Sequence, residues 1–526
     1  MAVFSPSRAR QRVGHQTRIL LIPLDDRPPC LQFTERIAMI ADAQIISPPK
    51  EMLGRYTDPG QSDKIVKWLK GQDLKSFDAA IISMDMLAYG GLVASREYQV
   101  TEQTALKRLE VLRELKRESP GLKIYAQSVI MRIAPTGGGK YEAYRSQLAE
   151  WGVVSVGKDE ASRTKTKSLE QEIPAGMLSD YMQARKRDLA VDLYAVNLAK
   201  EGVIDYLLVS QDDAHPQGVH VADREKIISH VKETGTEGKI AVQPGADEVS
   251  MLLLARVLND KYRYSPAVQV VYSSDKMSHE VMPFEDKPLS VTVADQIVST
   301  GARETDEGSK ADIFFFVFTS RFEPGAADRF ATEIDRKLKE GKQVMVADID
   351  PKGNVQGGDS AFAISLEKRG VLPALNSYAS WNTAGNTIGT ALSQGIVYSL
   401  ARAELTGLSD ARGSMLTAQH WFTFHRMLDD FYYHTLVRGK IKDLWKEGKL
   451  TGPGHQPDMK QVLAFSRRWM GKYFDSLREN YFGKNGSWAA EDLSCTGPRN
   501  LRFSFPWNRI FEAEISFDLQ CIPVKK

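Results

Sequence analysis

Two adjacent aspartates, Asp212 and Asp213, stand just behind the apolar run DYLLVS at residues 205–210. Side chains alternate along a strand, so neighbours at its end can reach one ligand from different directions. Two close carboxyl groups drive their pKa values apart, which yields one acid and one base, as glycoside cleavage requires. The plainer interpretation is that one aspartate caps the next helix or turn while the other faces water. We name both as candidate catalytic residues.

Other apolar runs also end in polar residues. Parallel strands place their carboxyl ends at one rim of the sheet, where ligands of α/β proteins bind. Part of this pattern has a structural explanation, since an Asp–Arg pair can simply stabilise a turn and acids at a helix start complement its dipole. The alternative is a pocket that holds sugar or other hydroxyl groups. The candidate binding residues are Asp25, Asp26, Arg27, Asp85, Tyr89, Arg132, His215, Asp247 and Glu248.

The segment YASWNTAGNTIG, residues 378–389, is the most unusual of the second half. Its threonine and asparagine can cap the following helix, and its glycines allow close packing. Capping does not explain Trp381 beside Asn382, an aromatic surface next to an amide. Such a pair can stack on a sugar ring and hydrogen-bond its hydroxyl groups, so both join the candidate binding residues.

Metal and nucleotide binding have weaker signals. His215 and His220 flank the aspartate doublet, but Pro and Gly separate them and no HExxH or HxH spacing is present. The loop PTGGGK, residues 135–140, lacks the GxxxxGK[ST] spacing of a phosphate loop and is better explained as a turn or a flexible active-site loop. We therefore predict a site without metal or cofactor.

Alternating strands and helices must position these groups. Apolar, β-branched runs begin at residues 18, 43, 77, 123, 205, 239 and 267, with amphipathic helical stretches between them. This alternation predicts a mostly parallel sheet, either a TIM-type barrel, which we slightly favour, or an open doubly wound sheet. We expect a flexible tail (1–16), a main α/β domain (17–285), a smaller α/β domain (286–405), and C-terminal helices with a β-hairpin (406–526).

The composition of the chain limits the classes of molecule that it is expected to bind. Of 526 residues, 69 are Lys or Arg and 67 are Asp or Glu, so the net charge of +2 argues against a nucleic-acid or anionic-membrane surface. Three distant cysteines do not indicate a disulfide framework or a zinc site, and the N-terminus lacks an apolar signal region. We expect a cytoplasmic protein that binds a small, sugar-like molecule. The sequence does not indicate its oligomeric state.

The phrases PLDDRP, SMDMLAYGGLVASR, QSVIMRIA, VSQDDAHPQG, PGADEV and YASWNTAGNTIGTALSQG resemble a bacterial family known only as domain of unknown function 4127. The resemblance covers about residues 18–400 and implies no reaction. More distantly, paired aspartates at a barrel strand end are similar to the substrate-assisted β-N-acetylhexosaminidases. By that analogy Asp212 would polarise the acetamido group, Asp213 would protonate the leaving oxygen, and Tyr272 would donate to the acetamido oxygen.

Three functions follow from these observations. The first is a carbohydrate-active hydrolase, a glycosidase that acts on an N-acetylated amino sugar if the analogy holds. The second is a metal-dependent hydrolase or lyase that uses Asp25, Asp26, Asp212, Asp213 and His215. The third is a non-catalytic protein whose acids bind a polyol or a cation.

Overall fold

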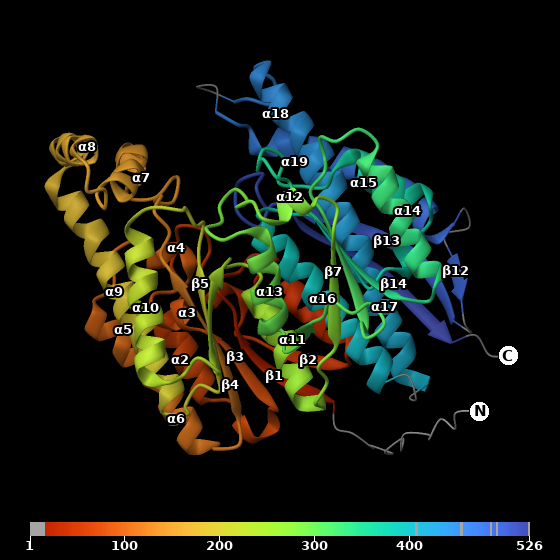
Figure 1. Ribbon diagram of the computed structural model, residues 1–526, viewed down its shortest axis with the longest axis horizontal. Helices are drawn as coiled ribbons and strands as arrows, with labels where there is room; N and C mark the ends of the chain where they lie inside the picture. The colour runs from red at the N-terminus through yellow and green to blue at the C-terminus, as the bar shows by residue number, and fades with distance from the viewer. Residues whose placement is uncertain (1–15, 406–408, 453–455, 484–486, 491–492, 524–526) are drawn as a thin grey trace.

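The first half of the chain forms an open six-stranded parallel sheet in the order β2-β1-β3-β4-β5-β6 (Figure 1). The computed structural model describes residues 16–405, 409–452, 456–483, 487–490 and 493–523. Side chains of β3 are buried along its whole length, as a strand covered on both faces requires. The strands are β1 (Thr17–Ile22), β2 (Ala43–Ile46), β3 (Ala79–Ser83), β4 (Lys123–Ile130), β5 (Tyr206–Gln211) and β6 (Ile240–Pro244).

The expected barrel does not form. β7 (Ala267–Tyr272), which was counted with the first series of strands, pairs with β8 (Arg303–Glu304) and β9 (Ile313–Phe318) in a second sheet. The first sheet therefore keeps two open edges, β2 and β6, and has the order of a doubly wound fold. Alternating strands and helices produce either architecture, because the pattern does not encode whether the last strand returns to the first.

Helices cover both faces of this sheet (Figure 1). α1 and α11 lie on the face that turns toward the second sheet, while α9 contacts β4 and β5 and packs against α10. The helices of this half are α1 (Gln32–Ile40), α2 (Ser62–Lys70), α3 (Met84–Ala88), α4 (Leu92–Ser95), α5 (Glu102–Leu109), α6 (Val111–Glu118), α7 (Arg145–Val154), α8 (Glu160–Glu172), α9 (Ala175–Lys200), α10 (Val219–Thr234) and α11 (Val249–Tyr262).

The second sheet is also parallel and runs in the order β11-β10-β9-β7-β8. In chain order this repeats the arrangement of the first five strands of the first sheet. α16, almost entirely buried, contacts α11 on one side and β10 and β11 on the other, so it forms the core between the two sheets. The remaining elements are β10 (Gln343–Asp348), β11 (Ser377–Ala379), α12 (Asp275–Ser278), α13 (Leu289–Ser299), α14 (Ala326–Lys339), α15 (Ser360–Lys368) and α16 (Ala384–Glu404).

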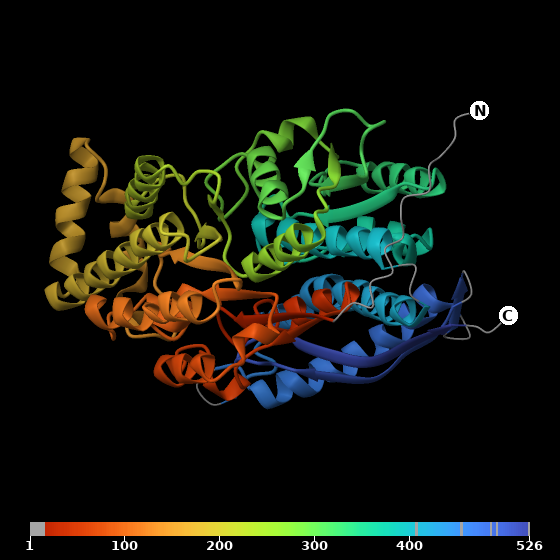
Figure 2. The same ribbon diagram turned by 90° about the horizontal axis from the view of Figure 1, so that it is seen from below.

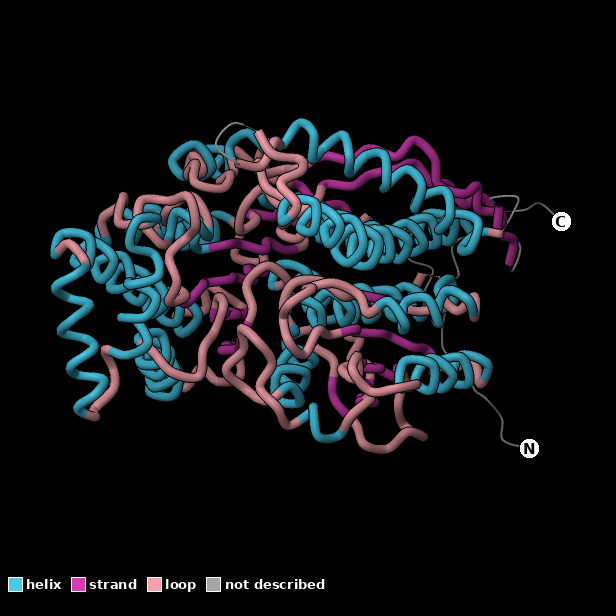
Figure 3. The backbone as a smooth tube through the Cα atoms, turned by 90° about the horizontal axis from the view of Figure 1, so that it is seen from above, coloured by secondary structure: helices cyan, strands magenta, loops and turns pink. Residues whose placement is uncertain are grey.

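The C-terminal part consists of helices and three antiparallel strands. Its strands lie at the outer edge of the molecule, where α17 contacts β14 and α19 contacts β13 (Figures 2 and 3). This confirms the predicted helices and hairpin. The elements are α17 (Ser409–Arg426), the π-helix η5 (Met427–Val437), α18 (Arg438–Lys446), α19 (Met459–Phe482), β12 (Ser487–Ala490), β13 (Leu493–Ser504) and β14 (Glu514–Pro523).

Cys495 and Cys521 form a disulfide, which the sequence did not indicate. The two residues are 26 positions apart, but β13 and β14 pair in antiparallel register and place them directly opposite one another. Cys30 is free and buried. No helix in the described ranges is long and apolar enough to cross a membrane.

Candidate functional site

A cavity of about 350 Å³ lies where loops after the strands of both parallel sheets meet the loop between β13 and β14. This is the end of an open α/β sheet at which ligands usually bind. The first sheet contributes Arg27, Leu92, Val93, Arg96, Arg132, Thr136, Gly137, Arg145, Asp212, Asp213, Gly245, Ala246 and Asp247, together with Tyr56. The second contributes Phe284, Gln356, Asn382, Thr383 and Asn386, and the C-terminal loop contributes Trp507, Arg509 and Phe511.

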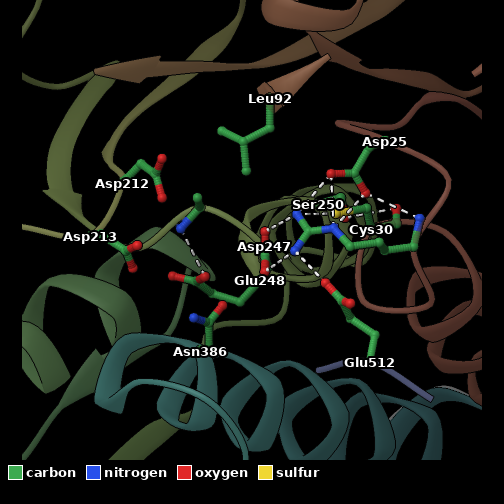
Figure 4. Close-up of polar contacts among 12 residues, drawn as sticks. Asp25, Cys30, Leu92, Asp212, Asp213, Asp247, Glu248, Ser250, Asn386 and Glu512 are labelled. Atoms are coloured by element: carbon green, nitrogen blue, oxygen red, sulfur yellow. Dashed lines mark hydrogen bonds and ion pairs between the residues drawn. The ribbon is translucent and has the colours of Figure 1, made fainter. Parts of the chain in front are cut away.

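Arg27 is the centre of a buried ion network on one side of the cavity. Its Nη2 lies 2.7 Å from an oxygen of Asp25 and 2.6 Å from Oδ1 of Asp247, and its Nη1 lies 3.5 Å from Glu512. Figure 4 shows these three carboxylates turned toward a common centre. Asp25 also accepts the backbone N–H of Arg27, a local turn that fixes the side chain behind β1. The predicted Asp25–Arg27 pair thus exists, and Asp247 joins it from 220 residues away.

Asp247 is a buried acid of the cavity lining. Burial raises its pKa to about 6, and the charge of Arg27 opposes the rise. Arg27 donates to both of its carboxylate oxygens, at 2.9 Å and 2.6 Å. A carboxyl group with a pKa near 6 can exchange a proton close to neutral pH.

The aspartate doublet lies in the cavity, and each member is paired with its own arginine. Arg96 Nη2 lies 2.5 Å from Asp212, and Arg132 forms an ion pair with Asp213. Asp213 adopts a left-handed conformation (φ 32°). Figure 4 shows Asp212 and Asp213 together on the side of the cavity away from Asp25. The doublet therefore ends its strand at a shared pocket, as predicted.

Two further acids are buried behind the cavity lining. Burial raises the pKa of Glu248 to about 8 and that of Glu285 to about 7. Glu248 accepts the N–H of Ala246 at 3.1 Å, and Glu285 accepts the N–H of Gly385 at 2.8 Å. Neither lines the cavity. Gln296 donates to Glu248 at 3.2 Å and to the carbonyl of Gly385 at 3.2 Å, which links the loop after β6 to the start of α16.

Asp26 is buried at the edge of the same site. It accepts a hydrogen bond of 2.7 Å from the indole N–H of Trp507. Burial raises its pKa, and the Trp507 hydrogen bond opposes the rise. Trp507 also stacks over the Arg27 guanidinium, with 4.7 Å between the guanidinium carbon and the ring centroid. The loop that carries this tryptophan is thereby anchored to the turn after β1.

Trp381 belongs to the core and does not line the cavity. Its ring meets Phe33 edge-on at 6.0 Å between centroids, and its N–H donates to Thr390 at 2.9 Å. Asn382 does line the cavity, where its side-chain oxygen accepts from Gln356 at 3.3 Å. The two residues predicted to act together therefore separate, because Asn382 has a left-handed backbone (φ 58°) at the turn into α16.

Four other predicted residues also lie outside the cavity lining. Asp85 accepts the N–H of Val129 at 3.1 Å, and burial raises its pKa well above the usual range. Tyr89 is buried against the guanidinium of Arg187, and Tyr272 ends β7 in the second sheet. His215 is exposed, and its backbone N–H donates to the ring of His220 at 3.2 Å.

Several cavity residues were not predicted from the sequence. Arg96 stands in a phrase that carried the family resemblance, yet nothing in its spacing marks it. Arg145 opens α7, and Asn386 lies in the first turn of α16. Trp507 and Arg509 come from the segment FPWNR, whose proximity to β1 depends on tertiary packing. Aromatic residues beside arginine in a hairpin loop were the one available signal.

Within the described part of the chain, no three His, Cys, Asp or Glu side chains are grouped so that they could hold a metal ion. The backbone N–H of His215 donates to the ring of His220 at 3.2 Å, and burial lowers the pKa of His220 to about 4.

Comparison with known families matches residues 19–516 to the family described as "Protein of unknown function (DUF4127)". No curated protein matches the chain. The match extends past the resemblance seen in the sequence and includes the C-terminal loop that reaches the cavity.

Proposed function

The chain belongs to the DUF4127 family, and from the geometry of its cavity we propose that it is a carbohydrate-active hydrolase. One observation carries this proposal: three aspartates, side-chain amides and aromatic rings line a single cavity of about 350 Å³. Carboxylates and amides hydrogen-bond hydroxyl groups, and aromatic rings stack on the apolar faces of sugars. The volume suits a small substrate of about one or two sugar rings.

The aromatic wall comes from Tyr56 and Trp507, whose ring centroids are 5.3 Å apart. Asn382 and Asn386 contribute polar side-chain amides to the same cavity. The Oδ1 of Asn386 is buried and has no hydrogen-bond partner in the described structure. The aromatic platform first assigned to Trp381 is thus reassigned to Trp507.

We assign proton transfer to Asp247. Its raised pKa, about 6, suits a group that donates and then accepts a proton near neutral pH. We assign the second carboxylate, a nucleophile or a group that stabilises positive charge, to Asp212 and Asp213, which line the same cavity and form ion pairs with Arg96 and Arg132. We do not retain the acetamido role of Tyr272, which lies outside the cavity lining.

The test is hydrolysis of a panel of 4-nitrophenyl glycosides, neutral, N-acetylated and acidic, by the full chain and by Asp247→Asn, Asp212→Asn and Asp213→Asn. We expect each variant to lose about 100-fold or more in kcat, and Asp247→Asn alone to lose the pH limb near 6. Asp275→Asn, a fully exposed aspartate on α12, is the matched control and should keep wild-type rates.

Full activity of Asp247→Asn would refute the assigned role. The binding-protein alternative would be favoured instead if sugars raise the thermal midpoint while no glycoside is cleaved. A cytoplasmic location stays a proposal, because the Cys495–Cys521 disulfide removes the cysteine argument that supported it.

A further inference from the structure

One arginine of the cavity lining, Arg145, has no carboxylate partner among the residues that the structure describes. Five arginines line the cavity, and four of them, Arg27, Arg96, Arg132 and Arg509, each form an ion pair with Asp or Glu. Arg145 forms none with any residue that the structure describes. Its Nε donates to the carbonyl of Pro135 at 2.9 Å, and its two terminal nitrogens have no hydrogen-bond partner in those same ranges.

A second guanidinium lies beside it. Arg132 Nη2 donates to the same Pro135 carbonyl at 3.4 Å, so both arginines meet at one oxygen. Only one carboxylate, Asp213, is paired with these two arginines in the described structure. Glu142 is a further carboxylate at this loop, where its Oε2 accepts the N–H of Gly138 at 2.8 Å, so Arg145 is distinguished by having no ion pair among the described residues.

The loop of residues 135–137 borders this end of the cavity. Gly137 lines the cavity, and a side-chain carbon placed on it would lie 4.0 Å from the guanidinium carbon of Arg145. Arg96 approaches from the other side, where its Nη1 donates to Thr136 at 2.7 Å. The Nε of Arg96 is buried and has no hydrogen-bond partner in the described chain. Three guanidinium groups thus contact residues 135 and 136 of this loop.

We propose that the substrate carries an anionic group, a carboxylate or a phosphate, and that this group binds Arg145 beside Arg132 at the loop of residues 135–137. This inference rests on the proposed carbohydrate function and names its substrate class as acidic sugars. A guanidinium with two free terminal nitrogens matches the two oxygens of a carboxylate or phosphate. Because Arg145 is exposed at the cavity mouth, it also attracts anions from solution.

Titration calorimetry on the full chain tests the inference with matched probes: glucose, glucuronate, glucose 6-phosphate and inorganic phosphate. We expect at least one acidic sugar to bind about 10- to 100-fold more tightly than glucose, and Arg145→Gln to remove that advantage while leaving glucose binding unchanged. Arg145→Lys should restore part of it, because lysine keeps the charge but not the paired geometry. Arg163→Gln, an exposed arginine on α8, is the control.

Tighter binding of glucuronate alone identifies a carboxylate, and tighter binding of glucose 6-phosphate alone identifies a phosphate. Equal binding of glucose and both acidic sugars, no binding of any acidic sugar, or full affinity in Arg145→Gln would overturn the inference. Arg145-dependent binding without cleavage of any glycoside would preserve the inference and refute the hydrolase. Cleavage of neutral glycosides that Arg145→Gln leaves intact would do the reverse.

Discussion

Replacing Glu248 by glutamine should remove a large pH dependence from the stability of the protein. The side chain has no exposed surface, and burial raises its pKa from an ordinary 4.5 to about 8. The folded protein therefore holds a proton that the unfolded chain has already released. Stability from this group is complete below about pH 4.5 and is lost as the pH rises through 8, by about 5 kcal/mol in all.

Glutamine is uncharged at every pH and keeps an oxygen to accept the N–H of Ala246. The variant should match wild type near pH 4.5 and be more stable near pH 8, by on the order of 10 °C in the thermal midpoint for a cooperative unit of about 250 residues. Taking the difference between the two proteins at each pH cancels the contributions of distant titrating groups, whereas Asp247 and Glu285 remain coupled to Glu248 because their charges raise its pKa.

Differential scanning fluorimetry across this pH range, with tryptophan emission as the signal, measures that difference. Glu118→Gln, an exposed residue at the end of α6, is the control and should parallel wild type throughout. A difference between Glu248→Gln and wild type that stays constant with pH would show that Glu248 is ionised in the folded protein. The description of the buried acids behind the cavity would then be wrong.

Two further substitutions test placements that differ from the sequence-based expectation. Trp381→Phe should lower the free energy of unfolding by about 1–3 kcal/mol, because the contact with Phe33 shrinks and the hydrogen bond to Thr390 is lost. Titration calorimetry should show unchanged sugar affinity. Weaker sugar binding at unchanged stability would instead place Trp381 in the binding site. Reduction of the Cys495–Cys521 disulfide should cost about 3 kcal/mol for a loop of 26 residues, seen as a lower thermal midpoint. Thiol titration of the denatured protein should find one free cysteine before reduction and three after it; three before reduction would contradict the pairing.

Local patterns in the sequence sufficed to predict the elements and the rim. Apolar β-branched runs predicted strands near the observed bounds of β1, β3, β4 and β5, because a strand buried on both faces must be apolar throughout. Parallel strands place their carboxyl ends at one edge of the sheet, so the polar residues that follow them converge there. Arg27, Asp212 and Asp247 do share one cavity. Closure of the sheet is a global property, so the choice between a barrel and an open sheet could not be made locally.

Long-range pairing explains what was missed. Trp507 lies 481 residues from its partner Asp26, and Arg96 lies 116 residues from Asp212. When the partner of a charged residue is so far away in the chain, the sequence does not show whether that residue is exposed or belongs to a buried ion pair. The same reasoning covers Trp381, whose indole N–H is satisfied inside α16 and therefore needs no ligand.

The distribution of charge suggests how a substrate would be oriented in the cavity. Around Arg27, the carboxylates of Asp25, Asp247 and Glu512 converge, and the acid with the raised pKa, Asp247, is among them. Arg145 lies elsewhere in the lining and has no ion pair among the described residues, so it and the carboxylates around Arg27 occupy different parts of the cavity. An acidic sugar held by its anionic group at Arg145 would direct its remaining atoms toward the groups that can transfer a proton. Because an anionic group bound beside Asp247 would be repelled by these carboxylates, the reverse orientation is disfavoured, and we expect the anionic group to set the register of the reacting bond.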